Sequence, residues 1–247
     1  MNLVAQALAV AAEGHPCALA TVIAASGSTP RHPGATMLFG ASGPLAGTIG
    51  GGRIELEVSA AAAEVMAGAP ARRVSHHLVR DLAMCCGGSM ELWIEPVAPS
   101  VLALAEALAC WRARRPGLLV TPLDGGPKRV VLLEAHLDRP PALDPEGFVE
   151  PIRPADRVLL FGVGHVARAI GPLAVSCGFE VVVCDDGDTG ALEAPLPWAA
   201  RVVESFDATD VERAVGGLGV GDYALIVTRD HAVDQRILEQ LLPRTEL

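Results

Sequence analysis

The spacing of hydrophobic positions divides the chain into two halves with different patterns. The first half mixes apolar or alternating runs typical of strands with segments whose apolar residues recur every three to four positions, as in helices. The second half alternates strands with helices, which indicates a parallel sheet. The helices expected in the first half cover 2–13, 53–68 and 100–115, and the strands cover 17–26, 35–39, 45–49, 71–79, 89–97, 117–123 and 128–135.

A proline-rich stretch separates the two patterns. Residues 136–156 hold five prolines and show little periodicity, which predicts an interdomain linker. The fold expected is therefore α/β, with an N-terminal α/β domain over 1–135 followed by a Rossmann-like parallel-sheet domain over 157–247.

Composition narrows the classes of function. The chain has 247 residues, is 51% hydrophobic and carries a formal net charge of −10. Because it has no basic run, nucleic acid and anionic membranes are poor partner candidates. We find neither a signal-peptide pattern nor an apolar run as long as a membrane span. The four cysteines in apolar segments are expected to be buried, and the protein to be cytoplasmic and reduced. These cysteines are Cys17, Cys110, Cys177 and Cys184.

The second half opens with a dinucleotide-binding fingerprint. Gly162, Gly164 and Ala167 form G-x-G-x-x-A between an expected strand and an expected helix, and Asp185 follows the next strand. Such a turn brings phosphate to a helix N-terminus, and the acid binds a ribose. We expect a helix from Gly164, with His165 and Asp185 at the mouth of a crevice that holds a nucleotide. The alternative is that this half is a docking or dimer scaffold.

Three glycine-rich loops stand out in the first half. The segments GSTPRHPG, GTIGGG and CCGG each lie beside an expected strand end, so they should gather at one sheet edge and line one cavity. Such a cavity would suit an anionic ligand that carries sulfur or metal, since it would offer Arg31, backbone N–H groups and the Cys86 thiol. A soft thiolate at Cys86 would need the loop N–H groups to lower its pKa, and we expect Cys86 to alkylate faster than Cys85. The alternative is that the glycines only turn the chain.

Other site chemistries find little support. Cys85 and Cys86 are adjacent and no second C-x-x-C is present, so the sequence does not predict a zinc site. There is no G-x-S-x-G motif for a nucleophilic serine.

The chain resembles the XdhC/CoxI family, the xanthine dehydrogenase accessory proteins, through five ordered motifs: GSTPRHPGATM, GTIGGGRIE, CCGGSMELWIEP, FGVGHVARAI and VTRDHAVD. The resemblance covers nearly the whole chain. It implies a chaperone that binds the molybdenum cofactor (molybdopterin), protects it while a cysteine desulfurase adds a sulfido ligand, and helps insert it into a molybdenum hydroxylase. The protein is not expected to be an enzyme, and a homodimer is expected.

The resemblance also implies site residues. Cys86 would be the metal contact, and Arg53 occupies a position where one branch of the family has cysteine. Family chains continue beyond LLPRTEL, so the last domain is expected to be truncated. The implied cofactor-binding residues are Ser28, Arg31, Gly34, Gly50, Gly51, Gly52, Glu55, Cys86, Gly87, Gly88, Gly162, Gly164 and His165, with Pro30 beside them. Asp185 joins the expected binding residues from the fingerprint spacing described above.

Two further interpretations stay open. One is an NAD(P)-dependent oxidoreductase that uses the C-terminal fingerprint, although no catalytic Tyr–Lys pair is evident and Tyr223 is the sole tyrosine. The other is a thiol redox sensor, which would need a resolving cysteine near Cys86.

Overall fold

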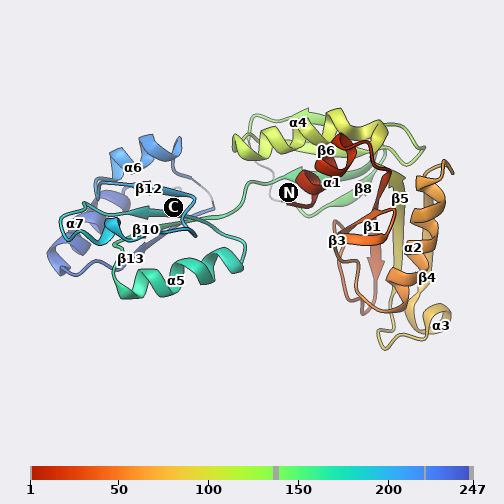
Figure 1. The fold of residues 1–247 in the computed structure, drawn as a ribbon, viewed down its shortest axis with the longest axis horizontal. Coiled ribbons are helices and arrows are strands. Elements are labelled where there is room, and N and C mark those ends of the chain that lie inside the picture. The colour runs from red at the N-terminus through yellow and green to blue at the C-terminus, as the bar shows by residue number, and fades with distance from the viewer. Residues whose placement is uncertain (1, 136–138, 220, 245–247) are drawn as a thin grey trace. The chain divides into compact units, whose positions relative to one another are not determined.

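The chain folds into two compact units, each with its own core (Figure 1). The computed structural model describes residues 2–135, 139–219 and 221–244. Unit 1 covers Met1–Pro154 and unit 2 covers Ala155–Leu247. Both combine helices with sheets, and the sheet of unit 2 is parallel, as the periodicity predicts.

Unit 1 is built on an antiparallel sheet, sheet A, with strand order β3-β2-β1-β5-β4. Strand β1 is central because its run CALATVIAAS is apolar on both faces, and it is buried over most of its length. The strands are β1 (Cys17–Ser26), β2 (Thr36–Gly40), β3 (Gly43–Gly47), β4 (Arg72–His77) and β5 (Ser89–Pro96).

Helix α2 (Arg53–Met66) covers one face of sheet A. Its buried residues recur at helical spacing, among them Ile54 and Val58, and they pack against the β1 side chains Ala20 and Val22. Beyond β4 the chain forms a short helix, α3 (Leu78–Leu82), where the pattern predicts that the strand continues. Side chains bond to the backbone at its start, because Asp81 Oδ2 accepts from His77 N at 2.7 Å.

The other face of sheet A packs against α1 (Asn2–Ala12), α4 (Val101–Arg112) and a second antiparallel sheet, sheet B. The one-turn helix η1 (Ala98–Ser100) precedes α4. Leu19 and Leu38 of sheet A share a core with Leu104 of α4 and with Leu119 and Ile152 of sheet B. Sheet B has the order β7-β6-β9-β8, with β6 (Gly117–Thr121), β7 (Arg129–Leu132), β8 (Ala142–Asp144) and β9 (Gly147–Ile152).

Strands β8 and β9 lie inside the segment that we interpreted as a linker. Strand β9 pairs with β6 over residues 148–152, so unit 1 extends to Pro154 and the linker prediction over 136–156 is too long. Pro151 is compatible with the strand because β8 pairs only with residues 147–149, which leaves Pro151 with a neighbouring strand on one side. Residues 136–138 lie outside the described residues.

Unit 2 contains sheet C, whose strand order β12-β11-β10-β13 and parallel pairing give a Rossmann-like unit. A short turn of helix, η2 (Ala191–Glu193), lies between β11 and β12. The strands are β10 (Arg157–Phe161), β11 (Glu180–Cys184), β12 (Arg201–Val203) and β13 (Asp222–Ile226), and the helices are α5 (His165–Ser176), α6 (Ala208–Val215) and α7 (His231–Leu241).

A buried ion pair fixes β10 beside β13. Arg157 Nε and Nη2 donate to the two carboxylate oxygens of Asp222, both at 2.8 Å, and Nη1 and Nη2 donate to the carbonyl oxygens of Val215 and Gly217. Because the Arg157 and Asp222 side chains are both buried, loss of either one would leave the other charge unpaired.

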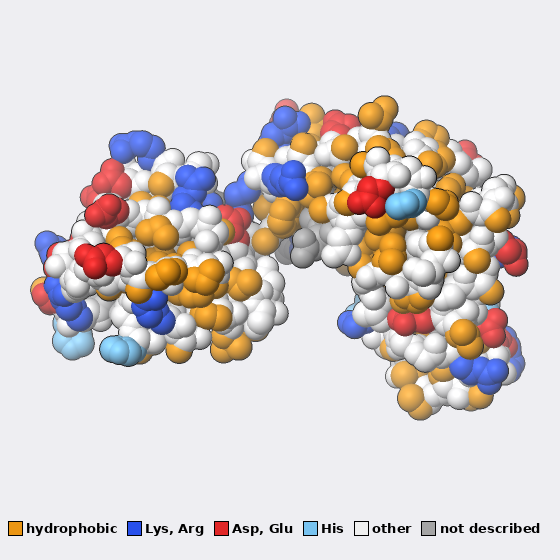
Figure 2. Space-filling model, in the orientation of Figure 1, with side chains coloured by type: hydrophobic (Ala, Val, Ile, Leu, Met, Phe, Trp, Pro, Cys, Tyr) orange, Lys and Arg blue, Asp and Glu red, His pale blue; other side chains and the backbone are white. Residues whose placement is uncertain are grey.

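Helix α5 is apolar on more than its inner face. Ala167 is buried against sheet C, whereas Val166 and Leu173 are 55% and 63% exposed, and hydrophobic side chains gather over this helix in Figure 2. Cys177, which directly follows α5, is exposed rather than buried as expected; Cys17, Cys110 and Cys184 are buried. Among the described residues, no helix has the length and apolar character needed to span a membrane.

Candidate functional site

Three glycine-rich loops of unit 1 lie at one end of sheet A. The antiparallel register places them there, because Ser26 at the end of β1 is opposite Ser89 at the start of β5, and Gly47 at the end of β3 is opposite Met37. We call them the glycine loops: loop 1 (27–35), loop 2 (48–52) and loop 3 (83–88).

The glycine loops touch one another. Gly88 N donates to the Ser28 carbonyl oxygen at 2.9 Å, which joins loop 3 to loop 1. A Cβ built on Gly50 would lie 2.5 Å from Pro30 Cγ, so loop 2 packs directly on loop 1. The structure therefore brings the three loops together, as the sequence predicts.

Glycine is required where the loops approach most closely. A Cβ on Gly88 would lie 2.4 Å from the Ser26 carbonyl oxygen and 2.5 Å from that of Ser28, both far inside contact distance. Gly51 and Gly87 differ, since a Cβ on either would have no atom within 4 Å. The backbone at these two positions is open, and a ligand could approach it closely.

Glu55, in the first turn of α2, turns back onto loop 2. Its Oε1 accepts from Thr48 Oγ1 (2.6 Å), Gly51 N (2.9 Å) and Ile49 N (3.1 Å). Burial alone would raise the pKa of this carboxyl, but the hydrogen bonds from Thr48 and from the loop backbone together hold it below its usual value. Glu55 thus shapes loop 2 and takes up N–H groups that the sequence interpretation assigned to a ligand.

Two arginines beside the loops are uncommitted. Arg31 in loop 1 and Arg53 at the start of α2 are exposed, and neither has a hydrogen-bond or ion-pair partner among the described residues. Gly52 is the N-cap of α2 and no side chain caps that helix. Ser28 is exposed in the same cluster. Free guanidinium groups next to an uncapped helix start favour an anion.

The two thiols of loop 3 lie side by side. Cys85 is exposed, Cys86 is half-buried against the core under α2, and their sulfur atoms are 4.0 Å apart. The contact with Cys85, followed by desolvation, raises the pKa of the Cys86 thiol. The lowering on which a reactive thiolate would depend is not found, because no loop N–H group among the described residues donates to the Cys86 sulfur.

The fingerprint of unit 2 forms the predicted turn. Gly162 has φ +98°, and a Cβ there would lie 2.8 Å from the Val227 carbonyl oxygen, so only glycine fits. Gly164 is the N-cap of α5, with open space around a would-be Cβ, and His165 is the exposed first residue of the helix. The helix thus starts within one residue of the predicted position.

Asp185 holds this turn together. It is 6% exposed, and its two oxygens accept from Val163 N and Gly187 N, each at 3.0 Å. The expected position at the mouth of a crevice does not fit a buried carboxylate that is already bonded on both oxygens. The exposed acid at this strand end is Asp186.

A second polar cluster lies between sheets A and B, and the sequence interpretation did not identify it. Lys128 Nζ lies 2.6 Å from Glu95 Oε1 and donates to Thr121 Oγ1 at 2.5 Å, and both charged side chains are almost fully buried. Of these three residues, Lys128 lines a cavity, together with Gly34 and Glu150. The available signal was that Lys128 is the only lysine in the sequence and that Glu95 sits in the apolar strand LWIEP.

The described residues contain no group of three or more His, Cys, Asp or Glu side chains placed to hold a metal ion. A metal at the glycine loops would therefore need most of its ligands from a bound molecule, with at most the thiols of loop 3 from the chain.

Comparison with known proteins gives two family matches. The XdhC and CoxI family matches residues 10–77, and the XdhC Rossmann domain matches residues 158–246. The first match includes loops 1 and 2, and the second includes the fingerprint of unit 2.

Two individual relatives are similar along almost the whole chain. The uncharacterized protein YqeB of Escherichia coli (strain K12) is 26% identical over 250 residues, which cover 98% of this chain and 35% of that protein. A crystal structure described as a xanthine dehydrogenase from Bacillus halodurans superposes with a TM-score of 0.81 at 24% identity, covering 99% of this chain and 79% of that one. At this identity the structural likeness concerns the fold.

Proposed function

Because this chain belongs to the XdhC and CoxI family, we propose that it is an accessory factor for a xanthine dehydrogenase-type molybdenum hydroxylase. In this role it binds the molybdenum cofactor, protects it during sulfuration and helps insert it into the client enzyme, without being an enzyme itself. One observation supports the proposal most strongly: the glycine loops bring two uncommitted arginines, open backbone and two thiols into one cluster.

The residues fit the anionic end of a molybdopterin. Its phosphate would be held by Arg31 and Arg53 and by N–H groups at the uncapped start of α2, since guanidinium and helix N-termini both favour phosphate. Glu55 is the opposing group, because its carboxylate lies in the same turn. The hydrogen bonds that Glu55 accepts direct its charge toward the loop backbone, which lessens the repulsion between its carboxylate and the phosphate.

The residues also fit the sulfur-rich end. When bound, the cofactor would supply molybdenum on a dithiolene, a soft centre that suits a sulfur contact from the protein. Cys86 is the proposed contact, with Cys85 beside it at 4.0 Å. The contact with Cys85 and desolvation raise the pKa of the Cys86 thiol, so the proposed sulfur contact does not depend on a pre-formed thiolate. Gly87, where a Cβ would meet no atom within 4 Å, leaves open space next to Cys86 in the chain.

The partners are part of the proposal. A client hydroxylase is supported by the family and by the name of the similar structure, and a cysteine desulfurase would supply the sulfur. We also propose that the chain acts as a homodimer. Unit 2 contains a turn of the phosphate-binding type, formed by Gly162, Gly164 and His165. We propose a nucleotide as a second ligand there.

The test is retention of pterin by the full chain. The protein is incubated with molybdopterin and passed through gel filtration, and the bound pterin is released, oxidised and measured by fluorescence. Arg31→Ala should weaken binding by about tenfold, the value of one charge-assisted hydrogen bond. Arg112→Ala is the matched control, since Arg112 is an exposed arginine at the end of α4. Retention that is equal in both variants, or absent from the unmodified chain, would contradict the proposal.

A further inference from the structure

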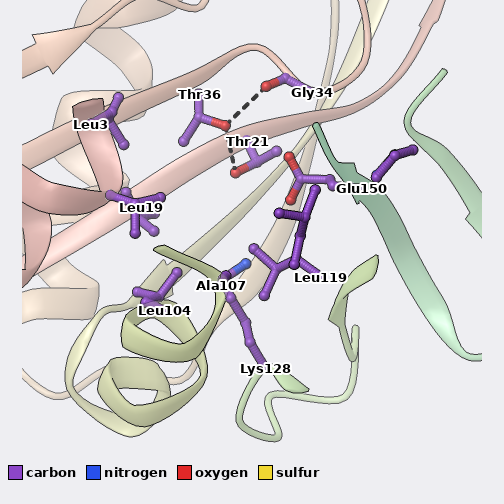
Figure 3. Close-up of a pocket in the computed structure, with 13 residues that line it drawn as sticks. Leu3, Leu19, Thr21, Gly34, Thr36, Leu104, Ala107, Leu119, Lys128 and Glu150 are labelled. Atoms are coloured by element: carbon purple, nitrogen blue, oxygen red, sulfur yellow. Dashed lines mark hydrogen bonds between the residues drawn. The ribbon is translucent and has the colours of Figure 1, made fainter. Parts of the chain in front are cut away.

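A cavity of about 270 Å³ lies inside unit 1, between sheet A, sheet B, α1 and α4 (Figure 3). It is on the face of sheet A opposite α2, because Leu19 and Thr21 alternate with the β1 side chains that pack under that helix. This size is just below the usual range for ligand sites, roughly 300–1,000 Å³, and suits one bicyclic ring rather than a whole nucleotide.

Most of the cavity wall is apolar. Leu19 of β1, Leu104 and Ala107 of α4, and Leu119 and Ile152 of sheet B approach it from different sides. Such a lining suits the two faces of a flat ring, because it removes apolar area from water without offering hydrogen bonds.

One edge of the cavity is charged. The Lys128 ammonium is only 2% exposed and already has two partners, Glu95 and Thr121. An ammonium has three N–H donors, so one is left for an occupant. Because the Glu95 carboxylate balances the Lys128 charge, this pair can donate a hydrogen bond to a ligand carbonyl without attracting an anion.

The other polar groups at the cavity are acceptors. Thr36 Oγ1 donates its one hydrogen to the Gly34 carbonyl oxygen at 3.1 Å, so in the 3.2 Å contact between Thr36 and Thr21 the donor is Thr21. Thr21 Oγ1 therefore has only lone pairs to offer. The Glu150 carboxyl points into the same space (Figure 3), and it has no hydrogen-bond or ion-pair partner among the described residues.

Glu150 is an unbalanced charge in this layer. Burial raises the pKa of its carboxyl, and the nearby Glu95 adds to the rise while Lys128 offsets part of it. A ligand that gives Glu150 two N–H donors would stabilise the carboxylate and remove this penalty.

We propose that this cavity is a binding site for a flat ring of the 2-amino-4-oxo-pyrimidine type, the part that guanine and pterin share. The neighbouring ring N–H and exocyclic amino group would donate to Glu150, and the ring carbonyl would accept from Lys128. The apolar walls would cover the ring faces. Neither Glu150 nor Lys128 belongs to the glycine loops, so the cavity and the proposed function can be tested separately.

The single lysine makes the test sharp. Full-length protein grown with lysine carrying the NMR-active nitrogen isotope gives one lysine amide signal, that of Lys128, whose N–H donates to Ser100 Oγ in the buried layer. This signal is followed during titration with neopterin and with guanosine. Lumazine and inosine are the matched controls, because each keeps the ring system and replaces or lacks the 2-amino group.

We expect the Lys128 signal to shift with neopterin or guanosine and to respond at least about tenfold more weakly to lumazine and inosine, since a site built for an N–H donor discriminates against its loss. A response to neopterin alone would identify a pterin, and a response to guanosine alone would identify a purine. Glu150→Gln should weaken either response about tenfold, whereas Glu146→Gln, at an exposed site, should not. No shift with any of the four compounds, equal shifts with the controls, or full binding by Glu150→Gln would overturn the proposal.

Discussion

Each unit places glycines ahead of a helix, yet the charged groups around the two turns are used differently. At the fingerprint turn of unit 2 the arginines are committed: Arg168 donates to the Ala191 carbonyl oxygen at 2.6 Å, and Arg229 pairs with Asp188. At the glycine loops of unit 1, Arg31 and Arg53 have no partner among the described residues. The same kind of motif therefore leaves cations available in one unit and not in the other.

The acidic residues at the two turns, in contrast to the arginines, are used in the same way. Glu55 in unit 1 and Asp185 in unit 2 both accept backbone N–H groups of their own turns. An acid near a glycine-rich turn can thus be part of the architecture of that turn. The comparison teaches that uncommitted donors, rather than glycines or acids, distinguish the better candidate site.

The largest effect on stability is expected from a substitution that disrupts the contact between loops 1 and 3. Gly88→Ala places a Cβ within 2.5 Å of two carbonyl oxygens and should lower the free energy of unfolding by about 3 kcal/mol. Gly87→Ala, next to it in open space, should change it by less than about 0.5 kcal/mol. Urea denaturation of both variants measures the difference. Equal stability would mean that the loops are not locked together.

The next effect concerns unit 2. Asp185→Ala leaves the N–H groups of Val163 and Gly187 without their acceptor and should destabilise this unit by about 2 kcal/mol. Hydrogen exchange of the β10 and β11 amides would report the loss. Asp186→Ala, at the exposed neighbour, is the control and should be nearly silent. If Asp185→Ala altered only nucleotide binding and not amide protection, the structural role would be refuted.

A smaller, pH-dependent effect is expected at loop 2. The pKa of Glu55 is lower in the folded chain than in the unfolded one, so its contribution to stability is present above the ordinary glutamate pKa and is lost as the pH falls through the folded value. Glu55→Gln should cost about 1 kcal/mol at neutral pH and less in acid. Unfolding curves recorded across the acid range test this. A constant difference at all pH values would show that the charge of Glu55 is not what matters.

The smallest effect separates the two thiols. Cys85 is exposed, whereas Cys86 is half-buried and its pKa is raised, so Cys85 should alkylate a few-fold faster near neutral pH. Tandem mass spectrometry of the protein with both thiols present, after brief treatment with iodoacetamide, shows which of the two carries the label. Faster reaction at Cys86 would restore the original expectation of an activated thiolate in loop 3.

Much of the fold follows from local pattern. The run CALATVIAAS predicts β1 at its observed bounds, and the strand–glycine–helix sequence at residues 157–177 predicts the first Rossmann unit, because both signals are carried by neighbouring residues. The gathering of the glycine loops could also be predicted, since strand ends in one sheet share an edge. Strand β9 could not, because its one proline and those flanking it mimic a linker and its partner β6 is distant in sequence.

The parts of the site that escaped prediction depend on how the loops and sheets are placed in three dimensions. Which donors Glu55 and Asp185 use, and that Cys85 lies against Cys86, become visible only when the loops are placed. The Lys128 layer combines strands from two sheets, so its residues are scattered across the sequence with no shared motif. Only the rarity of lysine in the sequence pointed to it.

That rarity has a consequence for how the chain can be cut. A protease that cleaves only after lysine has one target bond here, Lys128–Arg129, and the side chain it must grip is buried between sheets A and B. The folded chain should resist such a protease while arginine-directed cleavage proceeds at exposed positions. The rate of cleavage at Lys128 then reports how often sheets A and B separate. A molecule bound in the cavity between them would lower that rate.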